Sequence, residues 1–181
     1  TTHRDFARGN SRDFPPVYGD DRPFDPSALL RFKRLALFGA NRYADKLPPS
    51  ASWWVWDKLD GLTSKRDFGF NDNGDAELLW TNLGGPVRIL LHRWTGLIRA
   101  TERADRRVHP TQKPVALMAQ IVALATEPND LILDPYCGSG PVPLAAKRLG
   151  RRCIAVEIVE RYAEIAAKRL SQGVLALVAE E

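Results

Sequence analysis

A glycine-containing turn between two short apolar runs constrains the fold of this chain more than any other feature of its sequence. The run Leu-Ile-Leu at residues 131–133 leads into Asp-Pro-Tyr-Cys-Gly-Ser-Gly at residues 134–140, and a helical pattern follows over residues 142–149. A second apolar run, Cys-Ile-Ala-Val at residues 153–156, ends in Glu157. Glycine lets the backbone turn sharply and lets a ligand approach closely, because it has no Cβ. The order of strand, turn, helix and strand predicts a βαβ unit.

An acidic residue stands at the end of each predicted strand of this unit. Asp134 closes the first strand, and Glu157 lies about 20 positions beyond the turn, where a carboxylate is placed to accept both hydroxyls of a ribose. The following helix presents free N–H groups and partial positive charge at its N-terminus. A turn that only connects strand to helix would need neither acid, so we favour a nucleoside-binding site.

The spacing of the turn limits which nucleoside it suits. The pattern is Asp-x-x-x-Gly-x-Gly, which differs from the Gly-x-Gly-x-x-Gly of dinucleotide sites. The acid directly before the turn would repel a pyrophosphate and suits a ligand that carries a positive amine. A nucleoside with an amino-acid tail and no phosphate fits both ends of the site, which indicates S-adenosylmethionine as the cofactor.

Composition places the chain among globular proteins and limits its partners. Its 181 residues, 44% hydrophobic and 27% charged, suffice for one sizeable core. No apolar run approaches the roughly 20 residues of a membrane span, and the first 30 residues lack a signal-peptide core, so we expect a cytoplasmic protein without a membrane partner. The net charge of +4 permits a nucleic-acid partner but does not establish one. Cys137 and Cys153 are expected to be free buried thiols, and three scattered histidines predict no structural metal.

The rest of the chain predicts an α/β layered fold. Residues 1–24 are polar and aperiodic and predict an extended or disordered arm, and residues 25–181 predict a single domain. A helix is expected to begin at Asp25, a brief one to cover residues 42–47, and a last one residues 160–170. Further strands are expected at residues 35–38, 52–56, 77–80 and 87–91, the last two forming an antiparallel hairpin at one edge of the sheet. Residues 109–114 open a helix with an apolar face, which comprises Leu117, Met118, Ile121, Val122, Leu124 and Ala125.

Two features of the first half each have a structural and a functional interpretation. Trp54 and Trp56 share one face of a predicted strand, with Trp53 on the other; core packing is favoured over stacking on flipped bases, because large aromatics dominate cores. The basic stretch of residues 99–107 could contact phosphates or serve as a solvated linker, and charge alone does not separate the two. Its arginines are Arg99, Arg103, Arg106 and Arg107. The long polar loop at residues 60–75 is the segment where we would look for sequence recognition.

Two motifs in a fixed order resemble the amino-methylating DNA methyltransferases, which modify the exocyclic amine of adenine (N6) or cytosine (N4). His-Pro-Thr-Gln-Lys-Pro at residues 109–114 precedes the glycine turn of residues 134–140 by about 20 residues, as in the circularly ordered subgroup whose catalytic half comes first. Residues 35–58 also look like the middle strands of that family. The resemblance covers roughly residues 19–170. It implies a Rossmann-like S-adenosylmethionine-dependent methyltransferase fold, built on a mixed sheet with an antiparallel edge.

The resemblance also implies roles for particular residues. The turn and the acid after the next strand would bind S-adenosylmethionine, and the segment at 109–114 would line its methionine end. The implied cofactor-binding residues are Asp134, Tyr136, Gly138, Ser139, Gly140, Glu157, Thr111 and Lys113. Residues 25–108 would form a target-side half and residues 109–172 a cofactor-binding half. The implied partner is double-stranded DNA with a flipped target base.

The chain departs from the family at two places. The catalytic Asp/Asn/Ser-Pro-Pro-aromatic motif is absent, since the related letters at residues 14–18 begin with Phe14. In the family that motif ends a central strand, here expected before residue 1, so the sheet would lack its N-terminal strands and no catalytic residue is assigned. Pro141 and Pro143 follow the glycines, and Pro141 replaces a usual threonine, so an N–H and a hydroxyl are lost together.

The sequence therefore predicts a site-specific DNA amino-methyltransferase, either whole or as a truncated copy. Two alternatives remain: a methyltransferase of the same fold that acts on RNA or a small molecule, and a noncatalytic nucleic-acid-binding remnant. The choice between adenine and cytosine, the recognition sequence and the oligomeric state are left open.

Overall fold

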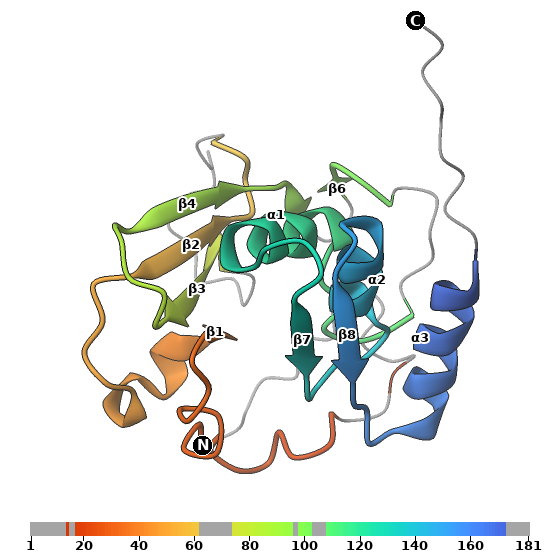
Figure 1. Cartoon of the computed structure of the whole chain (residues 1–181), viewed down its shortest axis with the longest axis horizontal. Coiled ribbons are helices and arrows are strands. Elements are labelled where there is room, and N and C mark those ends of the chain that lie inside the picture. Colours follow the sequence, from red (N-terminus) through yellow and green to blue (C-terminus); the bar gives the residue numbers. More distant parts are fainter. Residues whose placement is uncertain (1–13, 15–16, 62–73, 96–97, 103–107, 173–181) are drawn as a thin grey trace, which may run out of the picture.

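The computed structural model describes residues 14, 17–61, 74–95, 98–102 and 108–172 (Figure 1). The described strands are β1 (Ala36–Phe38), β2 (Trp53–Asp57), β3 (Ala76–Thr81), β4 (Arg88–Leu91), β5 (Trp94–Thr95), β6 (Ile98–Arg99), β7 (Leu131–Asp134) and β8 (Arg152–Ala155). The helices are α1 (Val115–Ala125), α2 (Pro141–Arg148) and α3 (Glu160–Ser171), with two 3₁₀ turns, η2 (Ala40–Arg42) and η3 (Ala44–Lys46). Most of the arm at residues 1–24, most of the loop at residues 60–75 and the last nine residues lie outside the described part.

The first half of the chain forms a four-stranded mixed sheet in the order β1-β3-β2-β4. Strand β3 runs antiparallel to β1 and to β2, whereas β4 runs parallel to β2. The predicted mixed sheet with antiparallel pairing is confirmed, but the predicted hairpin of β3 with β4 is wrong. Strand β2 lies between them, because the chain crosses over after β3 and places Leu90 beside Trp56, where both side chains are buried. Burial of large apolar groups thus outweighs the local signal of the glycine turn.

The second half forms the predicted βαβ unit. Strands β7 and β8 pair in parallel from Leu131 opposite Arg152 to Asp134 opposite Ala155, and α2 connects them. They form a two-stranded sheet of their own among the described residues. Helix α3 follows β8 and packs against α2 (Figure 1).

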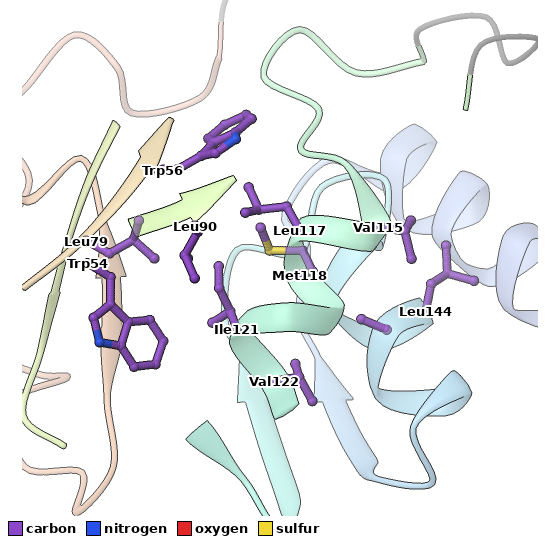
Figure 2. Close-up of a cluster of buried hydrophobic side chains, with 11 residues drawn as sticks. Trp54, Trp56, Leu79, Leu90, Val115, Leu117, Met118, Ile121, Val122 and Leu144 are labelled. Atoms are coloured by element: carbon purple, nitrogen blue, oxygen red, sulfur yellow. The ribbon is translucent and has the colours of Figure 1, made fainter. Parts of the chain in front are cut away.

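Helix α1 joins the two halves through one hydrophobic core (Figure 2). Its Leu117, Met118, Ile121 and Val122 are buried as the helical spacing predicts, on one side against the four-stranded sheet and on the other against Leu144 of α2. The same spacing predicts burial of Leu124, which is instead 46% exposed. Each fully buried aliphatic side chain contributes about 1.5–3 kcal/mol, so this cluster supplies much of the attachment between the halves.

The tryptophans of β2 pack as expected. Trp54 and Trp56 are 3% and 1% exposed and belong to the core around α1. The indole N–H of Trp56 donates a hydrogen bond to the carbonyl oxygen of His92 at 2.9 Å. Core packing of these two side chains is therefore confirmed over stacking on a flipped base.

The helix predicted to begin at Asp25 is wrong, and the brief helix predicted at residues 42–47 appears only as short 3₁₀ turns. The segment from Asp25 forms only hydrogen-bonded turns, with the N–H groups of Leu29 and Leu30 both donating to the Pro26 carbonyl. Residues 42–47 include the end of η2 and all of η3. Tyr43 lies between the two turns, and its φ of −142° is not helical, so the two do not join into one helix. The Tyr43 hydroxyl donates a hydrogen bond to the Phe38 carbonyl, five residues earlier, at 2.6 Å.

One face of the β7–β8 sheet carries three exposed apolar side chains in the described part of the chain, beside the exposed Arg152. Leu131, Leu133 and Ile154 point to the same side, because Leu133 is paired with Ile154, and they are 56%, 42% and 52% exposed. Parallel strands are usually covered on both faces. The thiol of Cys137 is buried and that of Cys153 is partly exposed, and both are free. No helix in the described ranges is long and apolar enough to cross a membrane.

Candidate functional site

The glycine turn between β7 and α2 has the geometry that only glycine adopts readily. Gly138 and Gly140 have φ angles of +52° and +79°, in the left-handed region. A Cβ added at Gly140 would lie 2.9 Å from the Cβ of Ala166 in α3, and one at Gly138 would lie 3.1 Å from Nε2 of His109. The turn is therefore closely covered by α3 on one side and by the segment before α1 on the other.

The two predicted carboxylates meet at this turn. Glu157 Oε2 accepts a hydrogen bond from the Gly138 N–H at 2.8 Å, and its Oε1 accepts one from the Val159 N–H at 2.9 Å. Asp134 Oδ1 accepts a hydrogen bond from the Tyr136 N–H at 3.3 Å. The sequence prediction that two acids end adjacent strands beside the turn is thus reflected in the geometry.

Asp134 has an unusual acidity. Burial raises the pKa of its carboxyl group to about 6, the Tyr136 N–H opposes that rise, and the negative charge of Glu157 adds to it. Burial and a second carboxylate nearby both disfavour the charged form of a carboxyl group. The site therefore favours a positively charged group beside Asp134.

His109 and Tyr162 lie together above the turn. Their ring centroids are 4.3 Å apart at an interplanar angle of 62°. The Tyr162 side chain is buried, and its hydroxyl has no hydrogen-bond partner among the residues that the structure describes. A buried hydroxyl without a partner is costly, so Tyr162 offers a donor to a ligand or a water. Sequence reasoning did not mark Tyr162 as a site residue, because helical spacing does not reveal what its hydroxyl meets.

The other predicted residues of the turn divide into buried and exposed ones. Ser139 is 1% exposed, and its carbonyl oxygen accepts a hydrogen bond from Arg169 Nη1 at 2.8 Å. Tyr136 is 67% exposed, with Phe24 as an edge-on ring neighbour at 5.8 Å. Tyr136 therefore presents a ring to solvent beside the turn, whereas Ser139 anchors the turn to α3.

Thr111 and Lys113, on the segment before α1, point to different surroundings. Thr111 is exposed, and its N–H donates to Nδ1 of His109 at 3.2 Å. Lys113 Nζ lies 2.8 Å from Oε2 of Glu77 in β3, and Lys58 Nζ lies 2.7 Å from Oε1 of the same carboxylate. Lys113 thus contacts the four-stranded sheet through Glu77, which also binds Lys58, and sequence reasoning assigned neither Glu77 nor Lys58 to the site. No local signal marks them, because their positions in the chain are far apart.

The basic stretch is described only in part. The Arg99 guanidinium carbon lies 4.8 Å from the centroid of the Trp94 ring. Arg103, Arg106 and Arg107 lie outside the described residues. Glu102 has a φ of +54°, accepts a hydrogen bond from the Val115 N–H at 2.8 Å and so caps the start of α1.

The fold and the site together define an α/β protein of the methyltransferase type, with two carboxylates on a glycine turn at the carboxyl ends of parallel strands. A family model described as a DNA methylase, of the N6/N4 type, matches residues 46–168. The chain belongs to this DNA methylase family, as the two motifs predicted. The predicted fold class is also confirmed.

The similar curated proteins are bacterial type II methyltransferases. M2.LlaDCHI of Lactococcus lactis subsp. cremoris is 42% identical over 104 residues, which are 58% of this chain and 34% of that protein. M2.DpnII of Streptococcus pneumoniae is 44% identical over 100 residues, 55% of this chain and 32% of that protein. The matches thus span about a third of the length of these relatives.

Two solved structures resemble the described fold. The M1.HpyAVI–SAM complex matches with a TM-score of 0.54 and 26% identity, over 77% of this chain and 74% of that one. The TTHA0409 protein of Thermus thermophilus matches with a TM-score of 0.50 and 20% identity, over 79% of this chain and 72% of that one. The second likeness bears on the fold alone.

Proposed function

We propose that this chain is part of a site-specific DNA methyltransferase that transfers a methyl group from S-adenosylmethionine to the exocyclic amine of adenine or cytosine. The observation that carries the proposal is the pair Asp134 and Glu157 on the glycine turn, in a chain of the DNA methylase family. Similarity to type II methyltransferases supports DNA as the substrate. Similarity to a structure titled as a complex with SAM supports the cofactor.

The residues around the turn fit this cofactor chemically. Asp134 is a partly buried carboxylate beside a second carboxylate, suited to the cofactor's positive amine. Each oxygen of Glu157 accepts one backbone N–H and keeps a lone pair for a ribose hydroxyl. The Tyr162 hydroxyl supplies a buried donor. When bound, S-adenosylmethionine supplies an electrophilic methyl group.

The cofactor-binding residues that we propose are those predicted from the sequence. Asp134 and Glu157 would bind the two polar ends, and Gly138 and Gly140 would allow close approach. Tyr136 presents an exposed ring beside the turn, where it can stack on an adenine. The remaining proposed residues are Ser139, Thr111 and Lys113.

We further propose that residues 25–181 act as one domain, with a target-side half over residues 25–108 and a cofactor-binding half over residues 109–172. The partner would be double-stranded DNA whose target base is flipped out of the helix. Arg99, Arg103, Arg106 and Arg107 would contact its phosphates. The loop at residues 60–75 would read the sequence, since it follows the carboxyl end of β2 at Asp57.

Catalytic competence would require groups beyond those identified in this sequence. Transfer to an amine depends mainly on holding its lone pair against the methyl carbon, and the Asp/Asn/Ser-Pro-Pro-aromatic motif that does so in the family is absent here. The proposal therefore assigns the cofactor side of the reaction to this chain. An upstream segment that carries the motif would supply the base side.

Tritiated-methyl transfer to unmethylated DNA tests the function. We expect transfer from a version of the protein extended with upstream coding sequence, and weak or no transfer from the 181-residue chain. A matched RNA competitor, and digestion of the labelled product with a DNA-specific nuclease, separate DNA from RNA methylation. Transfer by neither version, under conditions where M2.DpnII transfers methyl groups, would contradict the enzymatic proposal.

A noncatalytic nucleic-acid-binding protein is the second candidate, favoured by the missing catalytic motif. It predicts DNA binding that weakens with salt and does not depend on S-adenosylmethionine. Calorimetry with S-adenosylmethionine on the natural chain and on Asp134→Ala separates the two. Binding by the natural chain that is lost in Asp134→Ala supports the methyltransferase, and no binding by the natural chain supports the second candidate.

A further inference from the structure

The segment at residues 109–113 spans the two halves of the molecule. At its start, the His109 ring lies against the glycine turn, where a Cβ at Gly138 would come within 3.1 Å of its Nε2. At its end, Lys113 is bound to Glu77 in the four-stranded sheet. The segment therefore connects the turn with the end of the larger sheet where Glu77 lies.

Glu77 holds two lysines at once. Its two carboxylate oxygens lie 2.8 Å from Lys113 Nζ and 2.7 Å from Lys58 Nζ, and all three side chains are at most 26% exposed. Both ammonium groups also lie over the Trp56 ring, 5.8 Å and 5.3 Å from its centroid, and Trp56 itself is fixed in the core (Figure 2). Burial alone would raise the pKa of Glu77, but the two lysines outweigh it and lower the pKa. Glu77 is therefore charged and is held by two ion pairs.

Residues 109–113 have little conformational freedom, so a shift of Lys113 is not taken up within the segment. Only Pro110, Thr111 and Gln112 separate Lys113 from His109, and Pro110 and Pro114 fix their own φ angles. The Gln112 N–H donates to the His109 carbonyl at 3.3 Å, and its side-chain oxygen accepts from the Val108 N–H at 3.0 Å. A displacement of Lys113 is thus transmitted to His109.

The geometry assigns to Glu77 the role of a positioning residue for the cofactor site: through Lys113 it holds residues 109–113, and with them the His109 ring, against the Gly138 turn. Glu77 itself lies in β3, in the other half of the molecule, so its effect on the turn passes through Lys113. This role extends the proposed function, and the effect expected on cofactor binding rests on that function.

Glu77→Gln tests this role, because it removes the charge and keeps the size of the side chain. In amide exchange measured by NMR, we expect the Thr111 and Gln112 amides to exchange about tenfold faster than in the natural chain. The Met118 amide inside α1, bonded to the Pro114 carbonyl, should be unchanged and reports on global unfolding. The His109 ring signals should move toward those of a free histidine as the contact with Tyr162 loosens.

Two variants show whether Glu77 acts through Lys113. Lys58→Met removes the other partner of Glu77 and should leave the Thr111 and Gln112 amides protected. Lys113→Met should reproduce the effect of Glu77→Gln on the Thr111 and Gln112 amides. The double variant Glu77→Gln/Lys113→Met should show no larger effect than either single variant. Asp130→Asn, which breaks the exposed pair with Arg34 at 3.2 Å near the opposite end of β7, controls for the loss of an ion pair as such.

Calorimetry measures whether the same variants change cofactor binding. Binding of S-adenosylmethionine should weaken about five- to tenfold in Glu77→Gln, whose side chain is not among the proposed cofactor-binding residues, and less in Lys58→Met and Asp130→Asn. Unchanged Thr111 and Gln112 exchange in Glu77→Gln, or an equal effect of Lys58→Met, would overturn the assignment. If the natural chain binds no cofactor, the proposed function fails, whereas the exchange and His109 signals still decide the positioning role.

Discussion

Asp134 shows at the scale of one residue how a group suited to binding lowers stability. Its carboxyl group has a pKa of about 6 because burial and, secondarily, Glu157 disfavour the charged form. The same carboxyl in an unfolded chain has a pKa near 3.8. Since the folded value is the higher one, ionisation destabilises the folded state as the pH rises through this interval, and the penalty is complete above about pH 6.

Asp134→Asn should therefore stabilise the protein at neutral pH. We expect the free energy of unfolding at pH 7.5 to rise by about 1–2 kcal/mol, since one pKa unit corresponds to about 1.4 kcal/mol and relaxation reduces the full effect. Urea unfolding at pH 7.5 and at pH 4 measures it. A gain that is as large at pH 4 as at pH 7.5 would contradict the pKa argument.

Cofactor binding should depend on pH for the same reason. The amine of S-adenosylmethionine is attracted to ionised Asp134, so affinity should fall as the pH drops below about 6, by up to about tenfold per unit. Calorimetry at pH 7.5, 6.5 and 5.5 measures it, and the proton exchange on binding near pH 6 is read from buffers of different ionisation enthalpy. An affinity that stays constant down to pH 5.5 would show that Asp134 does not bind the amine.

Helix α2 follows the glycine turn of the proposed site, but its N-terminus lacks some of the usual N–H donors. It begins at Pro141, directly after Gly140, and a second proline follows at Pro143. Proline suits the first position because its φ is already helical, so the helix itself is not weakened. The helix N-terminus nevertheless presents fewer N–H donors to a ligand than an ordinary one.

Pro141→Thr should restore an N–H and a hydroxyl at this N-terminus. One added hydrogen bond contributes about 0.5–1.5 kcal/mol, so we expect S-adenosylmethionine to bind about two- to tenfold more tightly. The control is Pro143→Ala, which adds an N–H further into the first turn of the helix. Unchanged affinity in Pro141→Thr would indicate that the cofactor does not approach the start of α2.

At the scale of the whole molecule, the distribution of apolar surface is uneven. The core around α1 is shielded from solvent, with Leu117 fully buried, whereas Leu131, Leu133 and Ile154 on one face of the β7–β8 sheet are exposed. An open apolar face on parallel strands is uncommon. It accords with the proposal that an upstream segment completes this part of the molecule.

Two leucines should therefore respond very differently to substitution. Leu117→Ala should lower the free energy of unfolding by about 2–5 kcal/mol, because it leaves a cavity in the core. Leu133→Thr should change it by less than about 0.5 kcal/mol in the 181-residue chain, and by more in the version extended upstream. Chemical unfolding of both variants in both versions measures this, and equal costs in the short chain would contradict the exposed placement of Leu133.

The features that rest on local interactions could be predicted from the amino-acid sequence. The βαβ unit with its glycine turn, the acids Asp134 and Glu157 and the apolar face of α1 all follow from short-range spacing, because backbone freedom and helical period act over a few residues. Family membership followed from two motifs of the same kind.

The features in which distant residues meet emerged only from the folded structure. Strand β4 lies beside β2 rather than β3, because burying Leu90 beside Trp56 outweighs a local hairpin. The ion pair between Glu77 and Lys113 and the close approach of His109 to Gly138 join positions far apart in the chain. Sequence spacing carries no information on such pairs, since only the packed core fixes which surfaces come together.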